Sequence, residues 1–292
     1  MTSTTAAPGS GTPATTVRAA DPARRATEVS AYPTLPTERR FRIRVVATDA
    51  GRVHAQQTLP LETARTGTHL AGSLGPLVDF TIGRATQTVL SPTVAIRTAG
   101  LRMDLLSTAL TPGEIIEAHS RILDLDNYSV YGEVHITTAD GRPVARASAR
   151  MLIVPGEIGP TDPADAVTPP HPPTSLAALL TPLTHPMSAG GVTLTAPTAP
   201  WMTNPWGIAH GGIPAAFAGL ALEDAAHITA GPVRFIDLSL TYHRPITLGE
   251  DDIHTDARID RLGARTLAAT CSVYQQDSDR PAATATASLI RM

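Results

Sequence analysis

The feature that most constrains this chain is an order of elements that occurs twice, once on each side of a proline-rich segment. In each half, a helical segment of small and apolar residues precedes four segments that alternate apolar and polar residues. The helical segments span residues 73–90 and 213–228, and the alternating segments span 94–107, 114–126, 128–141 and 144–154, then 233–246, 251–263, 265–277 and 282–292. Such a repeat indicates two similar structural units.

The residue pattern within each half predicts how its elements pack. Period-2 alternation between turn residues is typical of antiparallel strands, and residues 40–60 and 190–200 show the same strand pattern ahead of each helix. A helix that is apolar on all sides is buried. We therefore predict an α+β fold of two modules, each a curved antiparallel sheet wrapped around one helix, related by a pseudo-two-fold axis.

Composition sets the expected boundaries of these modules. Residues 1–38 are rich in Thr, Ala, Pro and Gly without apolar periodicity, which predicts a flexible tail. Clustered prolines in residues 155–186 predict a linker, with a short helix at 176–183. The two modules are expected to span residues 39–154 and 187–292.

Charge and composition exclude several classes of protein. A net charge of −3 provides no basic surface for nucleic acid, and no patch suited to a membrane surface is present. The sequence contains no signal-like segment and no run of 18 apolar residues, so we expect a cytoplasmic protein. Cys271 is the single cysteine and fits a strand position. The chain has no lysine, which excludes a lysine base or Schiff base.

The segment WGIAHGGIPAAFAG at 206–219 contains a candidate oxyanion site. Gly211 and Gly212 permit close approach of a ligand to the backbone, and the first amides of a helix are unpaired and electropositive. The Gly211 amide could therefore polarise a carbonyl oxygen. The same letters also fit a tight helix entry with a packed or solvated His210, and the helix contains no acid before Glu223.

Combined with the strand segment LSLTYHRPITLGED, this motif resembles the hotdog-fold acyl-thioester hydrolases of the phenylacetate-pathway type. The matching residues are Asn204, His210, Gly211, Gly212, Tyr242, Pro245 and Gly249. In that family, an Asp or Glu nine residues after the His acts across a dimer interface with the partner's His-Gly-Gly turn. Here that position is Gly219, so the resemblance implies that the acid comes from elsewhere.

The first module provides a candidate for the missing acid. Laying LAGSLGPLVDF (70–80) on HGGIPAAFAGL (210–220) places Asp79 at the acid position. Laying LRMDL (101–105) on LSLTY (238–242) places Thr98 at the position where the family often has a hydroxyl. We thus expect one composite site of Asp79, Thr98, Asn204, His210 and Gly211. The mirror site would be chemically silent, since it would hold Leu70, Ala71, Gly219 and Phe235.

The resemblance implies hydrolysis of an acyl thioester carried by coenzyme A or an acyl carrier protein. Gly211 would bind the thioester oxygen, while Asp79 would act either as general base or as nucleophile. Thr98 would position water or Asp79, Asn204 would hold or polarise the substrate, and His210 would brace the turn. Gly212 would lie at the substrate, and Arg244 could meet a phosphate of the carrier arm or simply end a strand.

Two alternatives remain open from the sequence. The same site could dehydrate, isomerise or cyclise a carrier-bound chain, and a non-catalytic acyl-binding protein would keep the cavity without turnover. Glu223 and Asp224 lie beyond the acid position and fit a solvated or capped helix end. The remaining histidines, which include His54, His119, His135, His227 and His254, show no metal-ligand spacing, so we predict no metal and no cofactor. Assembly into a homo-oligomer is open.

Overall fold

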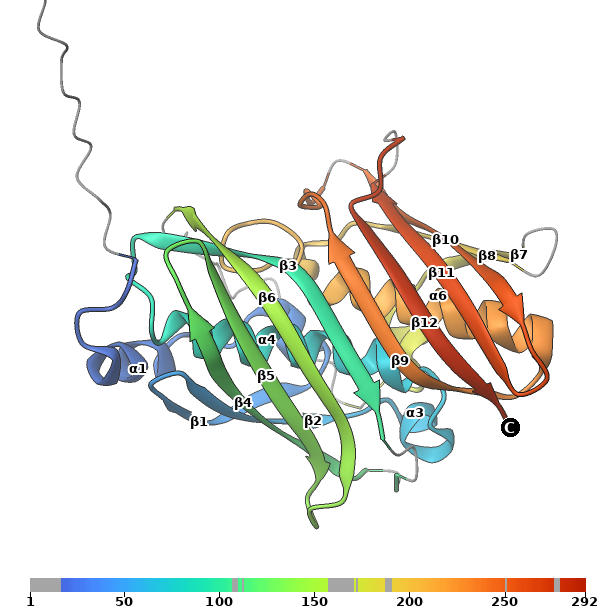
Figure 1. Cartoon of the computed structure of the whole chain (residues 1–292), viewed down its shortest axis with the longest axis horizontal. Coiled ribbons are helices and arrows are strands. Elements are labelled where there is room, and N and C mark those ends of the chain that lie inside the picture. The colour runs from blue at the N-terminus through green and yellow to red at the C-terminus, as the bar shows by residue number, and fades with distance from the viewer. Residues whose placement is uncertain are drawn as a thin grey trace, which may run out of the picture.

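The computed structural model describes residues 17–106, 110–111, 113–156, 171, 173–186, 191–249, 251–275 and 279–292. These residues form one sheet of twelve strands, and two long helices lie against one of its faces (Figure 1). Buried hydrophobic side chains of the sheet and of both helices form a continuous core. The α+β fold of two sheet-wrapped helices that the sequence predicts is confirmed.

The N-terminal module is built around helix α4, and the C-terminal module around helix α6. The N-terminal elements are β1 (Ile43–Asp49), β2 (Arg52–Thr58), α3 (Leu61–Thr66), α4 (Leu70–Gln87), β3 (Val94–Leu105), β4 (Ile115–Leu125), β5 (Ser129–Thr138) and β6 (Pro143–Pro155). The C-terminal elements are β7 (Leu183–Pro186), β8 (Val192–Pro197), the 3-10 turn η3 (Pro200–Met202), α6 (Gly212–Ala230), β9 (Val233–Tyr242), β10 (Asp252–Leu262), β11 (Thr266–Gln275) and β12 (Ala283–Arg291). Each predicted strand after a helix is present.

The order of strands in the sheet reveals the pseudo-two-fold axis. Strands run β1-β2-β4-β5-β6-β3 and then β9-β12-β11-β10-β8-β7, so the second module repeats the first in reverse. The modules join where β3 pairs antiparallel with β9, and Arg102 lies opposite Ser239 (Figure 1). These two residues are equivalent when residues 101–105 are laid on 238–242. The axis therefore passes through this pair.

Helices α4 and α6 approach each other so closely that glycine is required at their contacts. A Cβ on Gly219 would lie 2.6 Å from the Cα of Gly72, and a Cβ on Gly212 would lie 2.3 Å from the Cα of Pro76. Real Cβ atoms do not come that close to backbone atoms, so any larger residue would force the helices apart. This contact sets the start of each helix beside the middle of the other.

The expectation of a tail over residues 1–38 is wrong for its described part. Residues Pro22–Ser30 form helix α1, and Pro36–Arg40 form α2. Asp21 caps α1 by accepting hydrogen bonds from the amides of Ala23 and Arg24, and Val29 is fully buried. Packing against the module stabilises these short helices, which local periodicity alone does not reveal. Residues 1–16 lie outside the described residues.

The linker helix α5 (Leu176–Leu180) is present within the predicted span, and its residues Leu176, Leu179 and Leu180 are buried. Most of the proline-rich linker, residues 157–170 and 172, lies outside the described residues. In the described part of the chain, no helix combines the length and the apolar character needed to cross a membrane.

Candidate active site

The composite site brings residues from both modules together. Asp79 lies in α4 and is 6% exposed, while His210 precedes α6 and is 5% exposed. The Thr98 hydroxyl of β3 donates to Asp79 Oδ1 at 2.6 Å. His210 Nδ1 lies 3.1 Å from Asp79 Oδ2. Both carboxylate oxygens therefore meet a polar group, and one of these groups comes from each module.

Gly211 lies directly against the carboxylate. A Cβ built on Gly211 would be 2.7 Å from Asp79 Oδ1, 2.8 Å from Asp79 Oδ2 and 2.7 Å from Thr98 Oγ1. Gly211 is the N-cap of α6, and its amide has no backbone acceptor among the described residues. The motif needs glycine here because the carboxylate and the hydroxyl occupy the space of a side chain.

Thr98 is aimed at Asp79 by an irregularity in β3. The register with β6 shifts between Thr98 and Gly100, a bulge of the kind that often redirects side chains near sites. The pairing of β9 with β12 shifts at the corresponding place, next to Phe235. The bulge is thus common to both modules, and it supports the predicted equivalence of Thr98 and Phe235.

The proton on His210 is set by its neighbours. The Gly212 amide donates to His210 Nδ1 at 3.1 Å, which makes Nδ1 an acceptor and places the ring proton on Nε2. Burial lowers the pKa of His210, and the nearby Asp79 carboxylate opposes this shift only in part. The short distance between Nδ1 and Asp79 is accordingly a contact of a neutral imidazole rather than an ion pair.

The three remaining predicted residues occupy different places. Asn204 is buried beside the cavity, and its Oδ1 accepts hydrogen bonds from the amides of Trp206 and Ile208 at 2.9 and 3.3 Å. Gly212 is not among the described residues that line the cavity, because its amide is bonded to His210 and its Cα faces Pro76. Arg244 lines the cavity, and its Nη2 donates to the Arg280 carbonyl at 2.5 Å.

Tyr242 is a site residue that the sequence analysis names only as part of the family motif. Its hydroxyl donates to the Gly211 carbonyl oxygen at 2.6 Å, which fixes the peptide that precedes α6. Burial raises the pKa of Tyr242, and the charge of Asp79 raises it further, so the phenol stays protonated and remains a donor. The alternation of β9 could have indicated this inward position.

A cavity of about 520 Å³ opens at these residues. Asp79, Thr98, Asn204, His210 and Gly211 all line it. Its apolar walls include Leu35, Phe80, Ile96, Met151 and Ile246. A volume of this size suits a small-molecule ligand, with the polar group at one place on an otherwise apolar wall.

The segment of α1 and α2 completes the cavity and adds polar groups to it. Glu38 is 1% exposed, and burial raises its pKa to about 7 against the opposing charge of Arg84. Arg84 donates to the carbonyls of Val29 and Pro33, and its guanidinium lies 5.3 Å from the Phe80 ring centroid. Sequence reasoning missed this wall, although the Asp-Pro start of α1 was a usable signal.

The mirror site is filled. Gly219 packs against Gly72 in place of the acid, and Leu176 Cδ2 of α5 lies 2.7 Å from the position of a Cβ on Gly72. Glu223 is not at a solvated helix end, since it is 2% exposed and accepts a hydrogen bond from the His69 amide at the start of α4. The equivalent of the composite site is therefore occupied by helix packing and by the linker helix.

Comparison with known proteins agrees with this architecture. A family model described as an acyl-CoA thioesterase N-terminal domain matches residues 198–290, which is the C-terminal module. The search of curated proteins found no match. A single-module protein, a phenylacetic acid degradation protein from Thermus thermophilus, is 22% identical and covers 40% of this chain and 97% of its own, with a TM-score of 0.37.

Solved structures of two-module proteins match over most of the chain. An acyl-CoA thioesterase II from Mycobacterium marinum is 13% identical, with 88% of this chain and 98% of that chain covered and a TM-score of 0.57. A tesB protein from Mycobacterium avium subsp. paratuberculosis is 15% identical, with 84% and 95% covered and a TM-score of 0.58. The chain therefore has the double-hotdog fold of these structures, and its C-terminal module is similar to an acyl-CoA thioesterase domain.

Proposed function

We propose that this protein hydrolyses an acyl thioester at the single composite site between its modules. The observation that carries the proposal is the position of the Asp79 carboxylate, 2.7 to 2.8 Å from the place of a Cβ on Gly211. A base from one module thus adjoins an unpaired helix-start amide from the other. The match of the C-terminal module to an acyl-CoA thioesterase domain supports the same chemistry.

In this mechanism the Gly211 amide binds the thioester carbonyl oxygen. One donor of this kind typically lowers the barrier by about 3 kcal/mol, because it stabilises the negative charge that develops on the oxygen. The positive end of the α6 dipole acts in the same direction. Tyr242 contributes by holding the Gly211 peptide in place through its carbonyl.

Asp79 then takes a proton from water, whose oxygen attacks the acyl carbon. The carbon–sulfur bond breaks, the thiolate leaves and is protonated, and a carboxylic acid is released. After taking the proton, Asp79 can donate it from Oδ2 to His210 Nδ1, which is an acceptor 3.1 Å away. Direct attack of Asp79 on the acyl carbon, followed by hydrolysis of the anhydride, is the alternative route.

The other predicted residues take supporting roles in this proposal. Thr98 orients Asp79 through its hydrogen bond. Asn204 braces the loop of residues 204–208 with its carbonyl oxygen, which leaves its amide group for the substrate. Arg244 and Arg97 both line the cavity, and their charges suit the phosphates of coenzyme A or of a carrier-protein arm.

The test is thiol release and acyl-product mass on short, medium, long and aromatic acyl-CoAs, followed by acyl carrier protein substrates. Asp79→Asn should lower turnover about 10²- to 10⁴-fold. The matched control is Asp104→Asn, which changes an acid of the same strand as Thr98 that is 50% exposed in its side chain and outside the cavity lining.

The outcomes separate the candidate functions. Hydrolysis that collapses in Asp79→Asn and persists in Asp104→Asn supports the proposal. Full activity of Asp79→Asn on the true substrate would show that the assignment of the base is wrong. Binding of acyl thioesters without thiol release from any of them would favour dehydration, isomerisation or cyclisation when the product mass changes, and an acyl-binding protein when it does not.

A further inference from the structure

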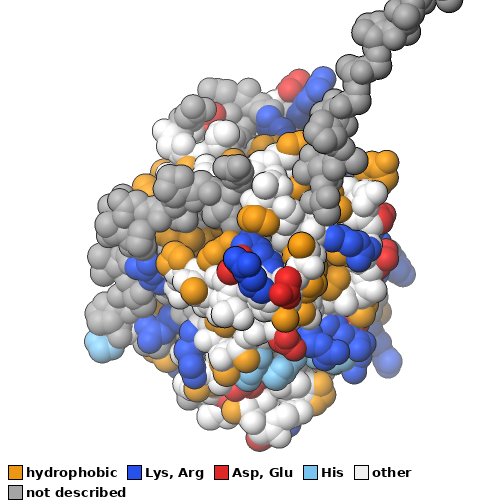
Figure 2. Space-filling model, turned by 90° about the vertical axis from the view of Figure 1, so that its left-hand side faces the viewer, with side chains coloured by type: hydrophobic (Ala, Val, Ile, Leu, Met, Phe, Trp, Pro, Cys, Tyr) orange, Lys and Arg blue, Asp and Glu red, His pale blue; other side chains and the backbone are white. Residues whose placement is uncertain are grey.

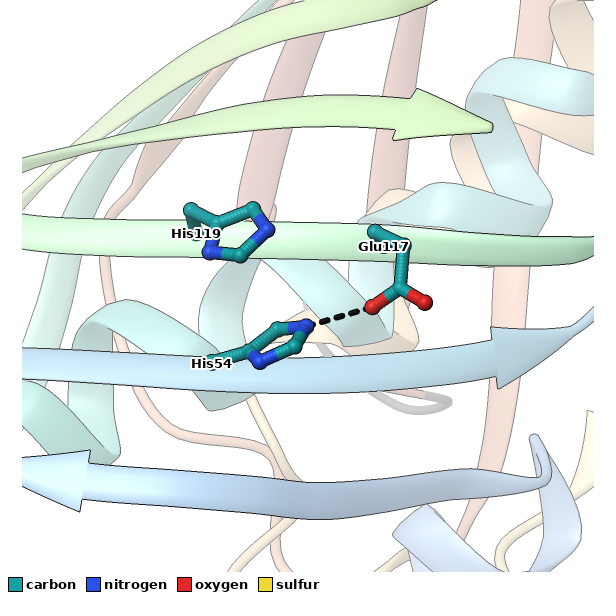
Figure 3. Close-up of side chains that lie close together, drawn as sticks. All are labelled: His54, Glu117 and His119. Atoms are coloured by element: carbon teal, nitrogen blue, oxygen red, sulfur yellow. Dashed lines mark hydrogen bonds and ion pairs between the residues drawn. The ribbon is translucent and has the colours of Figure 1, made fainter. Parts of the chain in front are cut away.

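A second cluster of chemically active side chains lies on the outer face of the N-terminal sheet. His54 in β2 is paired directly with His119 in β4, and the next outward pair along these strands is Gln56 with Glu117. Val53 and Ala55, the neighbours of His54, are buried, so the alternation points His54 away from α4. Figure 3 shows His54, Glu117 and His119 directed toward one another across the two strands.

The three side chains already have the spacing of a metal site. Their ligand atoms, one from each residue, all lie within 4.8 Å of one another. The rings of His54 and His119 are stacked, with centroids 4.1 Å apart and an interplanar angle of 18°. His54 Nε2 also contacts Glu117 Oε2. Small side-chain rotations are enough to direct two nitrogens and one oxygen at a common point.

A fourth residue orients the carboxylate of the cluster. Gln56 donates from Nε2 to Glu117 Oε1 at 2.6 Å, which leaves Oε2 turned toward His54. The Gln56 Oε1 atom is buried and has no hydrogen-bond partner among the described residues. Partners of this kind fix ligand orientation in metal sites, and the unpaired oxygen is an acceptor for a metal-bound water.

The donor set selects the class of ion. Two imidazoles and one carboxylate are borderline ligands that suit Zn²⁺ and similar divalent transition metals, and they leave one tetrahedral position for water. A ligating imidazole must be neutral. Burial lowers the pKa of His119, and the nearby His54 lowers it further, which favours the neutral ring.

We propose that His54, Glu117 and His119 bind a divalent transition metal ion of the zinc class. The ion would link β2 to β4 near the end of the sheet and stabilise the N-terminal module. The cluster is reached from solvent, since His119 is exposed and the His54 side chain is 27% exposed. Figure 2, which views the end of the molecule that carries this module, shows histidine side chains at the surface beside acidic ones.

The internal repeat provides a comparison within the same chain. The equivalent strands of the second module, β8 and β10, pair Thr193 with Asp256 and Thr195 with His254. That place holds one histidine and one carboxylate, and His254 contacts Asp256 at 3.0 Å. Two threonines replace the second histidine and the glutamine, so the second module should not bind the ion.

The experiment uses the full chain without a histidine tag, stripped of metal by a chelator. Zn²⁺ is titrated in against a chromogenic chelator, and Co²⁺ is used to record the absorption of a four-coordinate nitrogen and oxygen site. Wild type should bind one equivalent per chain and gain several degrees in Tm at saturating Zn²⁺. His119→Gln and Glu117→Gln should each weaken binding by at least about 100-fold, beyond the usual loss from an outer-shell partner.

Matched controls guard against nonspecific binding by surface histidines. His254→Gln changes the equivalent outer face, and His135→Gln changes the histidine on β5 that pairs with His119 from the other side. Both should keep the wild-type affinity. Unchanged affinity in His119→Gln, or wild-type binding weaker than about 1 mM, would overturn the proposal. The Tm of each metal-free variant shows whether it has folded, so a misfolded variant is not counted as a loss of binding.

Discussion

Replacement of Gly211 by alanine is the sharpest test of the composite site. The backbone of Gly211 has φ −59° and ψ −24°, which alanine adopts without strain. In an unstrained position, Gly to Ala raises stability by about 0.4 to 1 kcal/mol through the unfolded chain. Any loss of activity must therefore come from what the new methyl group displaces.

The displacement follows from the coordinates. The methyl group would lie 2.7 Å from Asp79 Oδ1 and from Thr98 Oγ1, whereas ordinary contact begins at 3.4 Å. Both groups must therefore move by about 0.7 Å. A misplacement of about 1 Å typically lowers rate about 100-fold. We expect Gly211→Ala to lower kcat/KM by about 10- to 100-fold.

The assay is thiol release under initial-rate conditions, together with a thermal melt of each variant. Gly100→Ala is the matched control, because a Cβ there meets only the Leu240 carbonyl oxygen, at an ordinary 3.5 Å. Its activity should stay near wild type. Wild-type kcat/KM in Gly211→Ala would refute the reasoning. So would a loss of activity that is matched by a large fall in Tm, since that would indicate unfolding rather than a displaced carboxylate.

Three further predictions test the neighbourhood of the site. Tyr242→Phe removes the donor to the Gly211 carbonyl and should cost about 1 to 3 kcal/mol of unfolding free energy, measured by urea titration; an unchanged midpoint would contradict it. Gly219→Ala places a methyl group 2.6 Å from the Gly72 Cα and should cost about 1 to 3 kcal/mol in the same titration; wild-type stability would show that the helices can separate freely. Burial raises the pKa of Glu223 from its usual 4.5 to about 7, so its contribution is present below pH 4.5 and is lost as the pH rises through 7. Glu223→Gln should remove about 3 kcal/mol of the fall in stability between pH 5 and pH 8, and a fall as steep as that of wild type would exclude this role.

Element order was predictable because it depends on periodicity. The helix predicted at 213–228 is observed as Gly212–Ala230, and the strand predicted at 265–277 is observed as Thr266–Gln275. Alternation and apolar runs are local signals, so each half of the repeat could be interpreted without contacts. The segment of α1 failed this approach because its stability comes from packing of Val29 and Ala26 against the module.

The pairing of Asp79 with the His-Gly-Gly turn was predictable for a different reason. Two copies of one unit must superpose, so laying 70–80 on 210–220 placed an acid opposite the turn before any contact was known. The geometry of that site was not predictable. The exclusion of a side chain at Gly211, the acceptor role of His210 Nδ1 and the hydrogen bond from Tyr242 depend on distances between distant elements.

The sequence by itself determined the repeat, the fold class and which residue types each module retained, since these follow from local patterns and from comparison of the two halves. Only the tertiary structure decided what closes the cavity and what lies on the outer face. Glu38 and Arg84 meet in the cavity wall from separate helices. His54 and His119 are 65 positions apart in the chain and become neighbours through the register of β2 with β4. Register is fixed by the burial of the opposite sheet face against α4, which no spacing in the sequence records.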